Sequence, residues 1–155
     1  MKGFYWLRRR IEIFKNLRGA QERKLFLQAL FLALFMPLLL RLRLTTLMRY
    51  FEPQTLAEPP GSSAERQGQV VLWALEFARP LVRSGCLVRG LTLYGSLRRV
   101  GWNISLCFGV APWKQGFTGH CWLTREGRPF LEPEGEGPGF SPVLQFPRKG
   151  VGLAE

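Results

Sequence analysis

The sequence predicts an α+β domain in which helices precede a small antiparallel sheet. Apolar residues repeat with a helical period up to Gly101 and with a period of two after it. A chain of 155 residues, 46% of them hydrophobic, is long enough to bury one core. We therefore expect a basic, leucine-rich helical N-terminal region (residues 1–51), a loop (52–68) and a core (69–155).

The positive charge is concentrated in the N-terminal third. Residues 1–50 contain eleven Lys and Arg against Glu12 and Glu22, hence +9, whereas the other residues contain eleven Lys and Arg against nine Glu, only +2. This asymmetry suggests an anionic partner, such as a membrane surface or an acidic peptide. Nucleic-acid binding is not favoured, because the aromatic residues are not interleaved with arginines in a recognition motif.

The N-terminal third is expected to be helical. Residues 1–19 mix aromatic, basic and apolar residues as an amphipathic helix does, and residues 25–40 form an apolar run in which Pro37 should kink or restart the helix. Sixteen helical residues span about 24 Å, less than the ~30 Å of a bilayer core. Three interpretations compete: a helix pair packed in the domain, attachment to a membrane surface, and a span or signal peptide, although no small-residue cleavage site follows the run.

Two further helices are expected before the sheet. After the loop at 52–68, which is rich in Pro, Gly and Ser, an apolar stripe predicts a helix that Pro80 should end near Ala78. The next helix should have Ser84 as its N-cap, Cys86 in its first turn and Gly101 as its stop.

The strands follow Gly101. Alternation predicts a half-buried strand over 104–110, then a loop over 111–116, and further strands over 118–124 and 128–132. The Gly- and Pro-rich tail from Pro133 should be irregular, with only some apolar side chains packed back on the domain.

A cysteine nucleophile with a histidine base is the functional arrangement that the spacing suggests. The first turn of a helix favours a thiolate, because its N–H groups and dipole attract negative charge, and Cys86 falls there. His120 is the only histidine and lies on a later strand. Aspartate is absent from the sequence, so an acidic partner for the imidazole must be a glutamate.

Glu132 is the candidate for that glutamate. A three-residue turn at 125–127 would pair Thr124 with Arg128 and therefore His120 with Glu132 on one face of the sheet. A two-residue turn would pair Glu132 with Cys121 on the opposite face. With the first register, Cys86, His120 and Glu132 would form a triad for acyl transfer to water or to an amine.

Plainer interpretations of the same residues remain open. Cys86 can be a buried structural thiol, His120 a satisfied core residue and Glu132 a solvated charge. A zinc site from Cys86, Cys107, His120 and Cys121 has poor ligand spacing, so neither a metal nor a cofactor is expected. Three cysteines without repeated spacing argue against a disulfide framework and fit a reducing, cytoplasmic compartment.

Residues 68–146 resemble the lasso peptide biosynthesis B2 family, which consists of leader peptidases of the transglutaminase-like superfamily. The resemblance is carried, in order, by CLVRGLTLY (86–94), LRR (97–99), FGV (108–110), GHCWL (119–123) and EGRP (126–129). It implies a papain/transglutaminase-like fold, with Cys86 as the nucleophile and His120 as the base. Glu132 falls where the family usually has aspartate, and Cys121 where a small residue, commonly alanine, is usual.

The resemblance also implies a function and partners. A cysteine peptidase of this family removes the leader from a ribosomally made precursor peptide through a thioester acyl-enzyme. A separate leader-recognition protein presents that leader, and an ATP-dependent macrolactam cyclase closes the ring on the freed N-terminus. We expect a cytoplasmic protein, or a peripheral one at the inner face of the membrane. The alternative is a membrane-associated scaffold or binding protein whose transglutaminase-like core is inactive.

Overall fold

The computed structural model describes residues 11–52, 62–83, 85–114, 116–132 and 139–147. Residues 11–16 are helical, and the longer helices are α2 (Gly19–Leu39), α3 (Leu44–Phe51), α4 (Ala64–Ala78) and α5 (Cys86–Val100). The strands are β1 (Ser105–Trp113), β2 (Gly116–Arg125), β3 (Arg128–Phe130) and β4 (Ser141–Phe146). They form an antiparallel sheet in the order β3-β2-β1-β4, so the predicted α+β class is confirmed.

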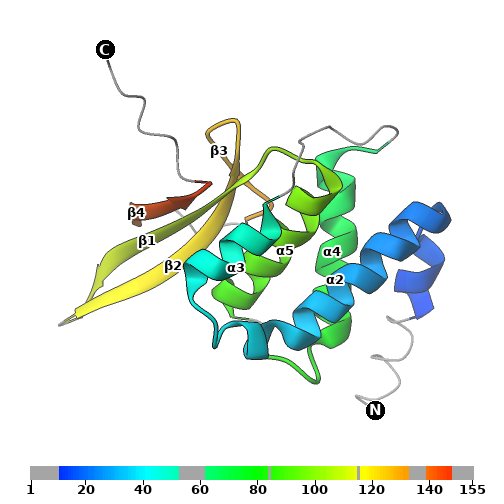
Figure 1. Cartoon of the computed structure of the whole chain (residues 1–155), viewed down its shortest axis with the longest axis horizontal. Helices are drawn as coiled ribbons and strands as arrows, with labels where there is room; N and C mark the ends of the chain where they lie inside the picture. Colours follow the sequence, from blue (N-terminus) through cyan, green and yellow to red (C-terminus); the bar gives the residue numbers. More distant parts are fainter. Residues whose placement is uncertain (1–10, 53–61, 84, 115, 133–138, 148–155) are drawn as a thin grey trace.

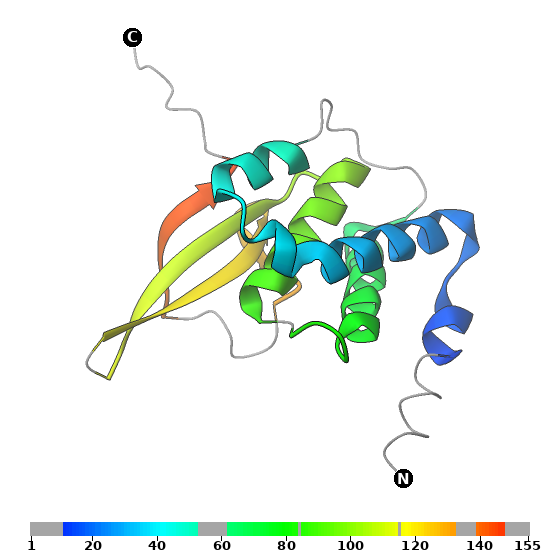
Figure 2. The same cartoon turned by 60° about the horizontal axis from the view of Figure 1, so that its bottom comes forward.

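Helix α5 is the centre of the fold. It packs against α2, α3 and α4 and also against β1 and β2, so the sheet lies on one side of it and the other helices surround the rest (Figure 1). Figure 2 shows α2 lying across α5 and α4. The burial of α5 is nearly continuous from Gly90 to Arg98, because each side of this helix has a neighbour.

The helix boundaries follow local capping. The Ser63 hydroxyl accepts a hydrogen bond from the Arg66 backbone N–H at 3.2 Å, so α4 begins at Ala64 and the predicted loop at 52–68 extends too far. The same helix ends at Ala78, as Pro80 predicts. Helix α5 ends before Gly101, whose φ of 114° is the left-handed stop that was expected.

The start of α5 differs from the prediction. Gly85 is the N-cap residue, in extended conformation, whereas Ser84 lies outside the described residues. Cys86 is therefore the first residue of the helix. The predicted position of the cysteine in the first turn is confirmed, although the predicted cap is wrong.

The sheet is larger than the sequence pattern indicates. Strand β1 continues to Trp113 and β2 begins at Gly116, so most of the loop predicted at 111–116 is paired strand. Strand β4, which was predicted to be irregular, pairs with β1 and buries Phe146. The proline at position 142 argued against a strand in the sequence, because Pro142 has no N–H to donate to a neighbouring strand. A proline is tolerated here because β4 lies at the edge of the sheet.

Helix α2 packs in the domain, as the first of the three N-terminal interpretations expects. One side of it is buried against α4 and α5, namely Leu25, Phe26, Ala29, Ala33 and Met36. Pro37 lies in its last turn, the helix ends at Leu39, and the chain becomes helical again at Leu44. Within the described ranges, no helix has both the length and the apolar content needed to cross a bilayer.

An ion pair connects the start of α2 to α4. The Arg66 guanidinium donates to both carboxylate oxygens of Glu22 at 2.8 Å, and the Arg18 backbone N–H donates to the same carboxylate at 2.6 Å. These hydrogen bonds, chiefly those from Arg66, hold the pKa of Glu22 below its ordinary value of 4.5. Because the Glu22 side chain is mostly buried, the pair stabilises the contact between the two helices.

The Glu22–Arg66 pair makes a pH-dependent contribution to stability. A lowered folded-state pKa means that this contribution is complete above about pH 4.5 and is lost as the pH falls through the folded-state value. Glu22→Gln should therefore lower the free energy of unfolding by about 1–3 kcal/mol at pH 7. Urea denaturation should show this difference shrinking at acid pH. The control, Glu126→Gln, removes an exposed carboxylate, and a pH-independent loss in Glu22→Gln would contradict the assignment.

Candidate active site

Cys86 is an accessible thiol at the N-terminus of a buried helix. The residue is exposed, and among the described residues no side chain caps the first N–H groups of α5. The N–H groups and the positive end of the helix dipole can stabilise negative charge on an oxygen bound beside the sulfur. The interpretation of Cys86 as a buried structural thiol is therefore wrong.

The turn between β2 and β3 has two residues rather than the predicted three. Arg125 pairs with Arg128, and Thr124 pairs with Pro129. Glu126 and Gly127 both have positive φ, 53° and 78°, which is typical of the tight turn that joins twisted strands. The predicted cross-strand pairing of His120 with Glu132 is therefore wrong.

Glu132 nevertheless contacts His120 by another route. Strand β3 ends at Phe130, and Leu131 takes a left-handed φ of 56°, which redirects the chain after the strand. The Leu131 side chain fills the space beside Gly68 of α4, where a Cβ would collide with it. Glu132 Oε2 then lies 3.2 Å from His120 Nε2, and both side chains are about 90% buried, with exposed fractions of 8% and 10%.

Arg89 connects this pair to the helix that carries the cysteine. Its guanidinium lies 3.4 Å from Glu132 Oε1 and also donates to the Leu131 carbonyl. Arg89 is three residues after Cys86, so both lie on the same side of α5. Arg89 was not predicted from the sequence: its spacing from Cys86 gives only a shared side of the helix, whereas its contacts with Glu132 and Leu131 arise from the tertiary structure.

Aromatic rings enclose the imidazole on the face of the sheet. The Trp122 ring is nearly parallel to it, with the centroids 6.0 Å apart, and the Phe140 centroid lies 5.1 Å away. Gly109 pairs with His120 across the strands, and a Cβ on Gly109 would lie 2.7 Å from the Trp122 ring. The absence of a side chain at Gly109 therefore provides the space that the Trp122 ring occupies beside His120.

The other two cysteines are buried. Cys121 points to the α5 side of β2, where its sulfur would lie 3.0 Å from a Cβ on Gly90, and Cys107 is also buried. Burial, and then the nearby Cys86 thiol, raise the pKa of Cys121 far above its ordinary value, so it stays neutral. The described residues contain no cluster of three or more His, Cys, Asp or Glu side chains that could hold a metal ion.

The arrangement has the elements of a nucleophile, a base and an orienting carboxylate. Glu132 contacts Nε2 of the imidazole, which leaves Nδ1 to exchange a proton with a thiol. The described residues show no hydrogen bond between Cys86 and His120, a contact that in catalytic sites often forms only with substrate bound. Chemically, this set of groups can perform acyl transfer through a thioester.

Comparison with known proteins identifies the wider family of this sequence. A model of the transglutaminase-like superfamily matches residues 32–145, which extend from the middle of α2 into β4. The match includes Cys86, His120 and Glu132. No curated protein and no solved structure matches the chain significantly.

Alkylation should distinguish Cys86 from the other thiols. Iodoacetamide should modify Cys86 in the native protein roughly tenfold faster or more than Cys107 and Cys121, because those two are buried. Peptide mapping by mass spectrometry measures the three rates separately. All three should react alike in urea, and comparable native rates at Cys86 and Cys121 would contradict this description.

The single histidine makes its protonation state directly measurable. Because Glu132 accepts at Nε2, the neutral imidazole should carry its proton on Nε2 and leave Nδ1 unprotonated. Nitrogen-15 NMR of an untagged protein reports this tautomer without overlap, since the sequence contains no other histidine. Glu132→Gln should weaken the preference, whereas Glu126→Gln should leave it unchanged. A proton on Nδ1 in the unaltered protein would contradict the assigned contact.

Proposed function

Because this chain belongs to the transglutaminase-like superfamily, we propose that it is a cysteine peptidase with Cys86 as nucleophile and His120 as base. Its α+β fold is that of a transglutaminase-like core with additional N-terminal helices. The observation that carries the proposal is the 3.2 Å contact between His120 and Glu132 beside the helix that begins with Cys86.

The proposed reaction proceeds in two acyl-transfer steps. His120 Nδ1 removes the proton from Cys86, and the thiolate attacks the carbonyl carbon of the scissile peptide bond. The backbone N–H groups at the start of α5 stabilise the resulting oxyanion. The imidazolium gives its proton to the leaving amine, which departs as the thioester forms. His120 then takes a proton from water, whose oxygen attacks the thioester and releases the carboxylic acid and the thiol.

Glu132 and Arg89 act as positioning residues in this mechanism. The carboxylate stabilises the imidazolium through Nε2 and fixes the direction of the ring. Arg89 holds the other carboxylate oxygen and the Leu131 carbonyl, so Glu132 cannot turn away from the histidine. Glutamate can therefore occupy the place where the B2 family has aspartate, because its extra length is constrained from both sides.

The proposed substrate is the precursor of a lasso peptide. This proposal is supported by the ordered resemblance of residues 86–129 to the B2 family, which includes the segments around Cys86 and His120. In that role the protein would remove the leader, which a separate recognition protein presents, and an ATP-dependent cyclase would use the freed N-terminus. Free thiols at Cys86, Cys107 and Cys121 support action in the reducing cytoplasm.

Reconstitution with a precursor peptide and a leader-recognition protein tests the proposal. Cys86→Ala should abolish leader cleavage with folding intact, and Glu132→Gln should slow it by roughly 100- to 10,000-fold, since an orienting carboxylate contributes less than the nucleophile. Mass spectrometry of the released core peptide measures both. Cys107→Ala is the matched control and should cleave at the normal rate.

Two outcomes would overturn this proposal. Cleavage by Cys86→Ala at the normal rate would exclude the cysteine mechanism. No cleavage by the unaltered protein, together with a Cys86 thiol no more reactive than the other two, would indicate the inactive scaffold instead.

A further inference from the structure

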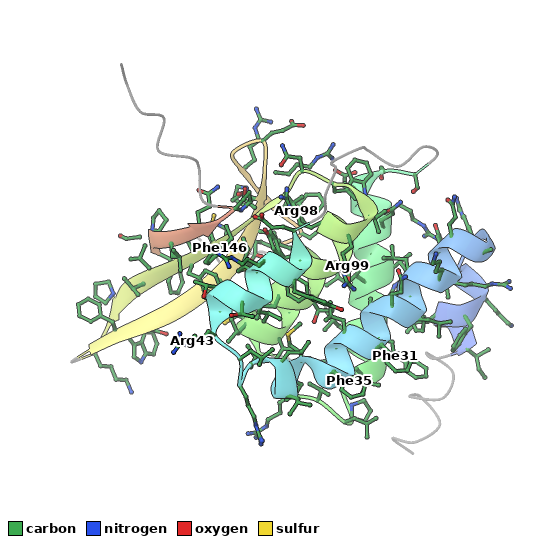
Figure 3. All side chains as sticks on the ribbon, in the orientation of Figure 1. Phe31, Phe35, Arg43, Arg98, Arg99 and Phe146 are labelled. Atoms are coloured by element: carbon green, nitrogen blue, oxygen red, sulfur yellow. The ribbon has the colours of Figure 1, made fainter. Side chains whose placement is uncertain are left out.

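From Leu25 onward helix α2 is apolar on all sides apart from Gln28, but the described part of the protein covers only one side of it. Its uncovered side, which continues past the helix end, carries an apolar stripe whose members are each more than half exposed: Leu27, Phe31, Phe35, Leu38 and Leu42. The Phe31 and Phe35 rings stack on each other with centroids 6.0 Å apart and project outward from the helix (Figure 3). A helix that is apolar all round is normally buried all round, which indicates that another surface covers this stripe.

Positive charges lie at both ends of the apolar stripe. Lys24 precedes Leu27 by one turn on the same side of α2, and the exposed Arg41 and Arg43 follow the end of the helix. A cavity of about 750 Å³ on the flank of α2 adds Arg18 and Arg99 to this charge. Among the described residues that line the cavity, Glu22 is the one carboxylate, and it is already bonded to Arg66.

Two surfaces could cover the apolar stripe, namely a second copy of the chain and a lipid membrane, and the charges at its ends distinguish between them. A second copy of the chain would place cationic ends against cationic ends whether the two α2 helices ran parallel or antiparallel. An anionic lipid surface would bind both the cations and the apolar stripe, because its headgroups attract the cations and its acyl chains accept the apolar side chains. We propose that α2 lies in the plane of an anionic membrane surface, with the apolar stripe immersed and Lys24, Arg41 and Arg43 at the headgroups.

This proposal is independent of the peptidase activity. Its residues lie on α2 and directly after it, whereas the candidate catalytic groups lie on α5, β2 and the segment after β3. The experiment can therefore use the Cys86→Ala protein as well as the unaltered one. Loss of membrane binding would leave the proposed reaction untouched.

Vesicle sedimentation tests the proposal. The full chain should pellet with phosphatidylglycerol vesicles and far less with phosphatidylcholine vesicles, and added NaCl should weaken the binding. Phe31→Ser/Phe35→Ser should weaken it by roughly tenfold or more, because two immersed rings are removed. The matched control is Leu81→Ser/Phe117→Ser, which removes two apolar side chains that are 77% and 79% exposed but lie outside the stripe.

Charge variants supply a second, separate measurement. Each of Lys24→Gln, Arg41→Gln and Arg43→Gln should weaken binding by about fivefold and reduce its dependence on salt. Three results would overturn the proposal: no binding to phosphatidylglycerol vesicles, equal binding by the Phe31/Phe35 and control variants, or equal binding to both lipids. A dimer in ultracentrifugation that Phe31→Ser/Phe35→Ser dissociates would assign the stripe to a second copy instead.

Discussion

The close packing of α5 on every side is the constraint from which the rest of the structure follows. Small residues make this packing possible, because a Cβ on Gly95 would collide with the Phe51 ring at 2.8 Å and a Cβ on Gly90 would be in tight contact with the Cys121 sulfur at 3.0 Å. A helix held by three other helices and by the sheet cannot shift along its axis without disturbing each contact. The first turn of α5 therefore has a fixed position relative to β2, and Cys86 has a fixed position relative to His120.

The candidate site is assembled from segments that no single strand pairing would bring together. The imidazole comes from β2, and the carboxylate follows β3 after a left-handed residue. Arg89 then joins that carboxylate to α5. The network thus connects the sheet edge to the cysteine helix, so that the geometry of the base and the position of the nucleophile depend on the same side chain.

Much of the fold could be predicted from periodicity. The helical stripe ending near Ala78, the cysteine at the start of α5 and the stop at Gly101 rest on local rules that the rest of the structure does not oppose. Strand β4 could not be predicted, because the Gly- and Pro-rich sequence at 133–140 that precedes it resembles a loop and the strand is stabilised by pairing with β1.

The site shows how a contact can be predicted for the wrong reason. The proximity of Glu132 to His120 was expected from a three-residue turn, but the turn has two residues, and Leu131 restores the contact through its positive φ. No local signal in the sequence indicates a left-handed leucine, because the residue type disfavours it. Arg89 was missed since its role depends on where Glu132 lies, which only the tertiary structure determines.

The contact between Gly68 and the Leu131 side chain limits which substitutions the sequence can accept during evolution. The Leu131 side chain occupies the volume that any side chain at position 68 would need, although Gly68 lies in α4 and Leu131 follows β3. A larger residue in α4 would therefore have to be accompanied by a smaller one after β3, or the carboxylate would leave the histidine. Among related sequences, positions 68 and 131 should accordingly vary together, even though neither touches a reacting atom.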